Sequence, residues 1–319
     1  MTDLPGNEQP QWERKTLEKL AFAALEEQRL RRRWGIFFKT LGFIYVLVVL
    51  VAFVDWGEDA AHQERHTALV HLNGVIEPRG EASAEKLIAA LQSAFEEKHA
   101  AGIVLRINSP GGSPVQAGMV NDEIRRLRAK YPDKPLYAVV EDLCASGGYY
   151  VAAAADKIYV NKASLVGSIG VIMEGFGFTG TMDKVGVERR LLTAGVNKGF
   201  LDPFSPQDPG QKAHAQGLLD DIHKQFIDVV RAGRGKRLKE TPEMFSGLVW
   251  TGAQSVELGL ADDFGSVESV ARDVVKAEKL FEYTVKDNIA ERVAKRLGAG
   301  AMSSFWDGLF TRASGVSLR

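Results

Sequence analysis

The chain has 319 residues, of which 45% are hydrophobic and 25% are charged, and its formal net charge is −1. These values are ordinary for a globular protein, and the near-neutral charge gives no indication of nucleic acid as a bulk partner. The single cysteine, Cys144, excludes an intrachain disulfide.

The N-terminal part predicts a membrane anchor. Residues 1–34 are polar and charged, and they end in a basic cluster at 29–33. From Gly35 to Val54 the only charged residue is Lys39, and a stretch of this length matches a bilayer core. A cleaved signal peptide would not follow 34 other residues, and a core helix would have a polar face. We therefore expect an uncleaved transmembrane helix at 35–56, with residues 1–34 in the cytoplasm and the remainder outside it.

After a polar linker at 57–66, strand-like and helix-like segments alternate, which predicts an α/β fold with a parallel sheet and right-handed crossovers. The expected strands are 68–72, 102–107, 135–141, 156–161, 187–192 and 281–285, and the expected helices are 83–99, 115–130, 211–231, 253–258 and 267–279. The domain at 67–287 is followed by a tail at 288–319 that carries an apolar cluster of Phe305, Trp306, Leu309 and Phe310.

The stretch 142–150 is the first candidate for chemistry. Ser146 lies between an apolar strand and a helix-forming run, and two glycines follow it directly. A serine at a helix start can attack a carbonyl, and the amide of Gly147 can bind the oxyanion that results. The alternative is an ordinary N-cap, a role that serine fills often.

A second glycine-rich loop, residues 108–113, also follows a parallel strand and precedes a helix. Ligands of open α/β sheets bind outside the carboxyl ends of the strands, so both loops are expected to face one crevice. The backbone of Gly111 and Gly112 is uncovered by side chains and is suited to an oxyanion hole or to an extended peptide. An ordinary strand–helix turn would use the same residues.

A serine nucleophile needs a base, and none of the six histidines has the sequence setting expected of a catalytic triad. Lys198 lies in a loop at 193–203, between glycines, where burial would allow it to lose its proton near neutral pH. The alternative is a solvated loop lysine. Cys144 is expected to be a buried structural residue.

No metal-ligand spacing is present, and the G-x-G-x-x-G pattern at 175–180 lacks the strand and acidic residue of a dinucleotide site. We therefore predict no cofactor.

Four motifs together resemble the signal peptide peptidase A family, in its short single-repeat form. They are Asn108-Ser-Pro-Gly-Gly, Ala145-Ser-Gly-Gly-Tyr-Tyr150, Gly167-Ser-Ile-Gly-Val-Ile172 and the Lys198 loop, and the similarity covers about residues 67–285. The resemblance implies a fold like those of ClpP and the crotonases. It also implies Ser146 as the nucleophile, Lys198 as the general base and Ser168 as the residue that orients the lysine. The amides of Gly111, Gly112 and Gly147 would form the oxyanion hole.

The resemblance further implies a homo-oligomeric ring in which Ser146 and Lys198 of one site come from neighbouring subunits. The substrates would be remnant signal peptides and other apolar, unfolded peptides at the bacterial inner membrane, with the catalytic domain on the periplasmic side. Two alternatives stay open, because fold does not fix function. One is an acyl-CoA enzyme of crotonase type, and the other is a non-catalytic membrane scaffold.

Overall fold

The computed structural model describes residues 9–53 and 64–285. The chain divides into two units, residues 1–61 and 62–319, and in the first unit the described part is a single helix, α1 (Gln9–Phe53). No helix in the described part of the chain is long and apolar enough to cross a membrane. The span predicted at 35–56 extends beyond the described residues, and the aromatic cluster of the tail at 288–319 lies outside them.

The second unit contains a parallel sheet with one antiparallel edge. The described strands are β1 (His66–Asn73), β2 (Ala100–Ser109), β3 (Leu136–Ala145), β4 (Lys157–Val160), β5 (Leu165–Gly167), β6 (Val249–Thr251), β7 (Asp263–Phe264) and β8 (Leu280–Glu282). Their order is β6-β5-β3-β2-β1-β8, and β4 pairs with β3 and β7. Only the β5–β6 pair is antiparallel among these strands. The predicted α/β class with a parallel sheet is therefore confirmed.

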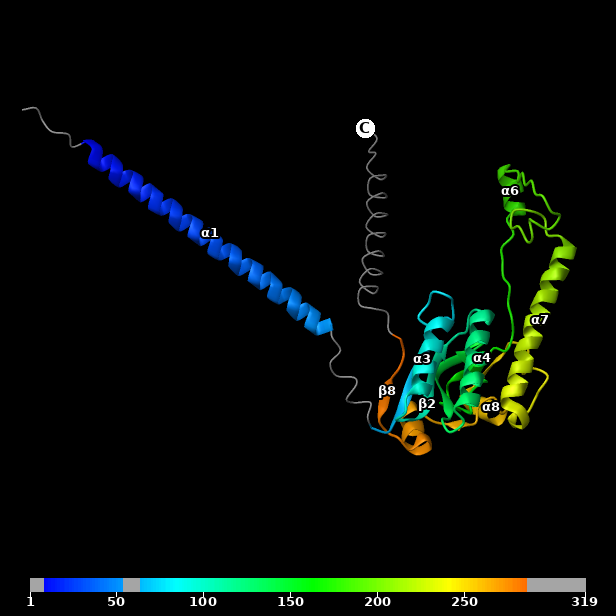
Figure 1. The fold of residues 1–319 in the computed structure, drawn as a ribbon. Coiled ribbons are helices and arrows are strands. Elements are labelled where there is room, and N and C mark those ends of the chain that lie inside the picture. Colours follow the sequence, from blue (N-terminus) through cyan, green and yellow to red (C-terminus); the bar gives the residue numbers. More distant parts are fainter. Residues whose placement is uncertain (1–8, 54–63, 286–319) are drawn as a thin grey trace, which may run out of the picture. The chain divides into compact units, whose positions relative to one another are not determined.

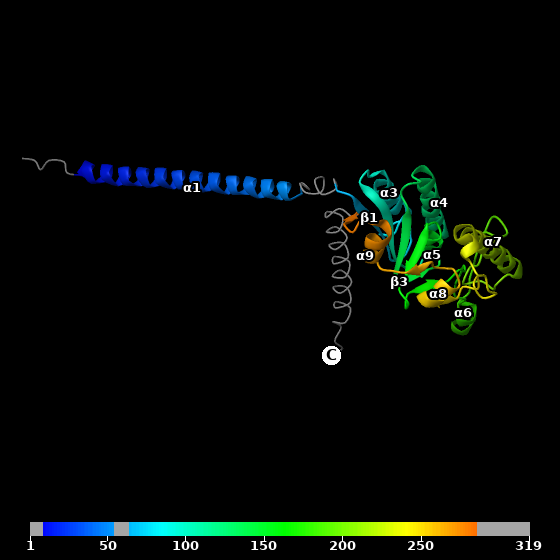
Figure 2. The same cartoon turned by 90° about the horizontal axis from the view of Figure 1, so that it is seen from below.

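Helices cover both faces of the sheet (Figures 1 and 2). The described helices of this unit are α3 (Ala84–Glu96), α4 (Pro114–Lys130), α5 (Gly147–Ala152), α6 (Thr179–Val185), α7 (Pro209–Arg234), α8 (Gly252–Glu257) and α9 (Val267–Ser269), with a 3-10 turn at Gly235–Arg237 and a π-helix, η2, at Val270–Val275. The larger core lies between the sheet and α3, α4 and α5, where Leu87, Phe95 and Ile124 are fully buried. A smaller core under α9 and η2 covers the other face through Val104 and Val139.

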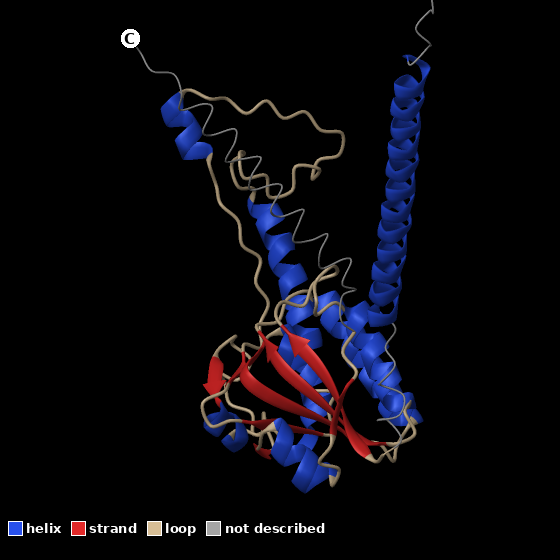
Figure 3. Cartoon of the chain, turned by 90° about the vertical axis from the view of Figure 1, so that its left-hand side faces the viewer, coloured by secondary structure: helices blue, strands red, loops and turns tan. Residues whose placement is uncertain are grey.

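Residues 171–204, which we call the arm, leave the sheet after β5 and contain α6. Figures 1 and 3 show α6 beyond the sheet, near the N-terminal end of α7. The strand predicted at 187–192 is wrong, because this segment is irregular and pairs with no other strand. Its apolar side chains are exposed instead, Leu192 by 97%, since no sheet edge lies beside them.

The helix predicted at 267–279 is present but ends earlier than expected, at Val275. Three residues of α9 pass into the π-helix η2, which stops at Lys276 in a left-handed conformation with φ 60°. Ser266 caps this helical segment by accepting the N–H of Ser269. The early stop allows the chain to turn back toward the sheet edge, where β8 pairs with β1.

Candidate active site

Ser146 occupies a strained position between β3 and α5. Its backbone has φ 52° and ψ −123°, a conformation that L-residues rarely adopt, and its N–H donates to the carbonyl of Gly167 at 2.8 Å. Its side chain makes no capping hydrogen bond to the helix that follows. The hydroxyl of Ser146 is thus not used as an N-cap, which removes the main structural alternative for this residue.

The two predicted glycine loops meet at this serine. A Cβ atom added to Gly111 would lie 2.6 Å from the backbone nitrogen of Gly147 and 2.7 Å from Cβ of Ser146. Gly111 has φ +96°, so both its conformation and its lack of a side chain are required for this close approach. The loop at 108–113 and the start of α5 therefore form one continuous main-chain surface.

The amides of this surface divide into used and available donors. The Gly111 N–H donates to Oγ of Ser109 at 3.1 Å, so it is not directed at a ligand. The two residues that flank Gly112 both bond to Ile76: the carbonyl of Gly111 accepts its N–H, and the N–H of Ser113 donates to its carbonyl. In such a parallel pairing the N–H of the residue between them points away from Ile76. Gly147 is the first residue of α5, where a helix leaves its N–H groups without helical partners. Gly112 and Gly147 both line the pocket in front of Ser146.

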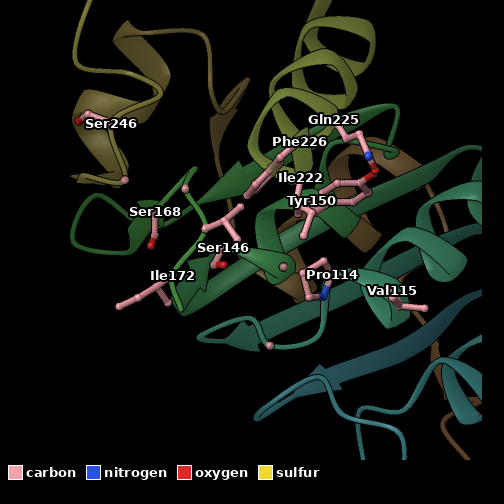
Figure 4. Close-up of a pocket in the computed structure, with 15 residues that line it drawn as sticks. Pro114, Val115, Ser146, Tyr150, Ser168, Ile172, Ile222, Gln225, Phe226 and Ser246 are labelled. Atoms are coloured by element: carbon pink, nitrogen blue, oxygen red, sulfur yellow. The ribbon is translucent and has the colours of Figure 1, made fainter. Parts of the chain in front are cut away.

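This pocket has a volume of about 590 Å³ and mostly apolar walls. Figure 4 shows Ser146 between Ser168 and Pro114, with Ile222 and Phe226 of α7 beside them, and Val115 of α4 also lines the pocket. Tyr150 completes the lining, and burial raises the pKa of its phenol. The volume and the apolar walls suit the side chains of an apolar peptide.

Ser168, to which the family resemblance gives the role of orienting Lys198, lines the same pocket directly after the end of β5. Its φ is 50°, and its N–H donates to the carbonyl of Leu248 at 2.7 Å. Two serines with positive φ thus face one cavity. Residues held in such conformations cluster at functional sites.

Lys198 lies elsewhere. It is exposed on the arm and is not among the residues that line the Ser146 pocket. Its neighbours Asn197 and Phe200 border a separate hollow with His214 near the N-terminal end of α7. From His214 to Gln225, which lines the Ser146 pocket, α7 rises about 16 Å. The fold of one chain therefore joins Ser146, Ser168 and the glycine amides but leaves Lys198 apart from them.

Cys144 and the histidines do not compete for the nucleophile and base roles in this pocket. Cys144 is fully buried, and burial raises the pKa of its thiol, so its expected structural role is consistent with the structure. No described histidine lines the pocket. His223 comes nearest on α7, and its Nε2 lies 3.1 Å from the carbonyl oxygen of Ile169, to which it donates.

The wall contributed by α7 was not predicted. Ile222 and Phe226 are four residues apart and therefore lie on one face of the helix. This spacing was visible in the sequence, but it also fits an ordinary core face. Only the packing of α7 against α5, where Tyr150 and Phe226 have ring centroids 5.1 Å apart, distinguishes the two.

Comparison with known proteins adds the family. A model of peptidase family S49 matches residues 128–280. A putative signal peptide peptidase SppA of Enterococcus faecium is 30% identical over 222 residues, which cover 67% of this chain and 64% of that protein. A putative protease of Synechocystis sp. is 31% identical over 201 residues, which cover 63% of this chain and 70% of that protein.

A Brucella melitensis biotype 1 protein named Na(+)/H(+) antiporter NhaA is 42% identical over 214 residues, which cover 66% of this chain but only 29% of that protein. An α/β fold with a glycine-flanked serine at the carboxyl end of a parallel strand is consistent with a hydrolase of the peptidase class. The chain belongs to peptidase family S49. This confirms the resemblance to the signal peptide peptidase A family.

Proposed function

We propose that the protein is a serine peptidase that cleaves apolar, unfolded peptides, among them remnant signal peptides. The observation that carries the proposal is the setting of Ser146. Its hydroxyl caps no helix, its backbone is strained, and it opens onto an apolar pocket beside the amides of Gly112 and Gly147. Family S49 membership favours a peptidase over an acyl-CoA enzyme or a non-catalytic scaffold.

In the proposed reaction, Oγ of Ser146 attacks the scissile carbonyl while Lys198 accepts its proton. The developing oxyanion is bound by the N–H groups of Gly112 and Gly147, and loss of one such donor costs about 3 kcal/mol of barrier. Ser168 orients the lysine amine from the other side of the pocket. Lys198 then protonates the leaving amine, and a water hydrolyses the acyl-enzyme.

The base is supplied by a neighbouring subunit in this proposal. Support comes from the position of Lys198, which is exposed and lies at the opposite part of α7 from the Ser146 pocket. The exposed apolar side chains of the arm, including Phe176, Leu192 and Val196, offer a surface for such a neighbour. A ring of subunits with a ClpP/crotonase-like fold would bring the two halves of each site together.

The proposed location is the inner membrane, with residues 1–34 in the cytoplasm, an anchor at 35–56 and the domain at 67–287 outside the cytoplasm. The uncharged sequence from Thr40 to Val54 supports this placement. Extraction tests it directly: the full-length chain should stay with membranes after alkaline carbonate treatment. Release into the supernatant would contradict the anchor.

Activity is tested with the full-length chain in detergent and a fluorogenic apolar peptide. Ser146→Ala and Lys198→Ala should each abolish cleavage, and a fluorophosphonate should label the wild type but not Ser146→Ala. Mixing the two inactive variants should restore some activity, because intact sites form where the remaining Ser146 and Lys198 meet. Cleavage at the wild-type rate by either variant would refute the assignment of its residue.

A further inference from the structure

An ion pair between Arg189 and Asp202 joins the two ends of the loop that carries Lys198. Arg189 donates from Nε to Oδ2 of Asp202 at 3.2 Å, and the same oxygen accepts the Ser205 hydroxyl at 2.6 Å. The hydrogen bond from Ser205 is the main cause that lowers the pKa of Asp202, with Arg189 acting in the same direction. These contacts therefore hold the two ends of the Lys198 loop together.

A second contact ties the loop to α7. Oε1 of Gln211, in the first turn of that helix, accepts the backbone N–H of Leu201 at 3.0 Å. Leu201 has φ 52°, which is unfavourable for a residue with a branched side chain. Such a conformation persists only where the surroundings hold it. Gln211 is the side chain that the structure places on the Leu201 amide.

A ring contact adds to this attachment. Phe200 and His214 meet edge to face, with ring centroids 5.8 Å apart, one turn of α7 beyond Gln211. Phe200 and Leu201 are two and three residues from Lys198. Their attachment to α7 therefore constrains the backbone that orients the lysine side chain. α7 is a helix of 26 residues whose other end is packed in the core, and it provides a rigid support.

We infer that Gln211 is a positioning residue for Lys198: by holding Leu201 in its left-handed conformation, it sets the lysine for delivery to the active site of the neighbouring subunit. The inference rests on the proposed function, since it takes Lys198 as the base. Gln211 is not among the residues that line the Ser146 pocket of its own chain, and it borders the separate hollow beside Phe200 and His214. Its role is therefore separate from binding substrate in its own subunit.

The direct test compares two substitutions in the full-length chain. Gln211→Met keeps the length of the side chain but removes the acceptor, and Gln211→Glu keeps an acceptor oxygen. We expect Gln211→Met to lower kcat about tenfold with KM within twofold, because a base displaced by a fraction of an ångström reacts poorly. Gln211→Glu should retain most of the activity. Gln216→Met, the same change at an exposed position of α7, is the matched control.

A rescue experiment separates positioning from loss of folding. Glycine adopts positive φ without a steric cost. Adding Leu201→Gly to Gln211→Met should therefore recover part of the lost kcat. A Gln211→Met protein with the kcat of the Gln216→Met control would overturn the inference, and so would a double variant no more active than Gln211→Met alone.

Mixed assemblies give the most specific readout. When Ser146→Ala and Lys198→Ala chains are mixed, a restored site takes its lysine from the Ser146→Ala chain. Gln211→Met should therefore reduce the restored activity when it is added to the Ser146→Ala chain, and leave it unchanged when added to the Lys198→Ala chain. Equal reductions from both chains would refute the positioning role.

Failure of the proposed function would look different. If Ser146→Ala and Lys198→Ala give no restored activity after verified subunit exchange, the shared site is wrong. The kcat values of Gln211→Met and Gln211→Glu then still decide whether Gln211 acts on the lysine within its own chain.

Discussion

Replacing Ser146 by glycine should give a more stable protein than replacing it by alanine. Both variants lose the hydroxyl, so both are inactive, and they differ only in what the backbone tolerates. At φ 52° and ψ −123° an alanine keeps the strain of the native serine, whereas glycine occupies this region freely. The difference in unfolding free energy between the two variants thus contains the strain stored at the nucleophile, reduced by the greater entropy that glycine loses on folding.

The size of the effect follows from two opposing contributions. Releasing a residue from a sparsely populated conformation gains about 1–3 kcal/mol. Glycine gives back about 0.5–1 kcal/mol, because it loses more conformational freedom on folding. The net gain is about 1 kcal/mol, which corresponds to a melting temperature about 2–4 °C higher for a domain of this size.

Thermal unfolding of the full-length chains, followed by circular dichroism, measures this difference. Ser83 provides a control, since it precedes α3 as an N-cap without a side-chain cap bond but has an ordinary φ of −71°. Glycine is also preferred to alanine at an ordinary N-cap, so the difference between the two variants at Ser83 gives this contribution without a positive φ. The gain from glycine at Ser146 should exceed the gain at Ser83 by about 1 kcal/mol. A gain from glycine at Ser146 that is no larger than the gain at Ser83 would show that the serine is unstrained and would refute the reasoning.

Three further predictions concern the site and its support. Gly112→Ala puts a Cβ 2.2 Å from a main-chain oxygen and should lower kcat about 100-fold, because it displaces an oxyanion donor. Gly118→Ala, in open space on α4, should leave kcat unchanged. Equal kcat values for the two variants would contradict the assignment of Gly112. Phe226→Ala enlarges the pocket and should shift cleavage of a peptide library toward bulkier side chains, and an unchanged profile would count against its role as a wall. Arg234→Met removes the buried partner of Asp262, which keeps its ion pair with Arg237, and should cost about 2 kcal/mol of stability at pH 7, measured by urea unfolding. Burial alone would raise the pKa of Asp262, but hydrogen bonds led by Arg234 lower it. The stabilisation is therefore present above an unfolded-state pKa of about 3.9 and is lost as the pH falls through the folded-state value, so the cost of Arg234→Met should shrink by pH 3, and a constant cost would refute the linkage.

The central strands and helices followed from the sequence because each has a periodic pattern and a clear boundary. The strand predicted at 102–107 lies within β2 (Ala100–Ser109), and the helix predicted at 115–130 is α4. Pro114 at the first position of α4 and the Ser113 cap mark its start. These elements bury their apolar faces against one another, so local pattern and tertiary packing agree.

The arm could not be predicted in the same way. Val187, Leu191 and Leu192 have the composition of a strand, yet a strand forms only where a neighbouring edge offers hydrogen bonds. No such edge lies beside them in the described chain. Likewise, the glycine loops indicated the crevice in advance, but the positive φ of Ser146 and Ser168 could not be predicted. The backbone N–H groups of these two serines bond to Gly167 and Leu248, which are distant from them in the sequence.

The burial of Cys144 makes the only thiol of the chain unreactive in the folded protein. Its thiol is fully buried and its pKa is raised, so thiol reagents at neutral pH should leave the native protein unmarked. Any cysteine introduced at the surface would then be the sole reactive thiol of the folded chain.

Val196, exposed by 96% on the Lys198 loop, and Val115, exposed by 70% at the pocket rim, are suitable positions. If the Lys198 loop of one subunit contacts the pocket rim of its neighbour, oxidation of a mixture of Val196→Cys and Val115→Cys chains should form a disulfide between two subunits. The resulting covalent dimer would be detected by gel electrophoresis, and the native cysteine need not be replaced.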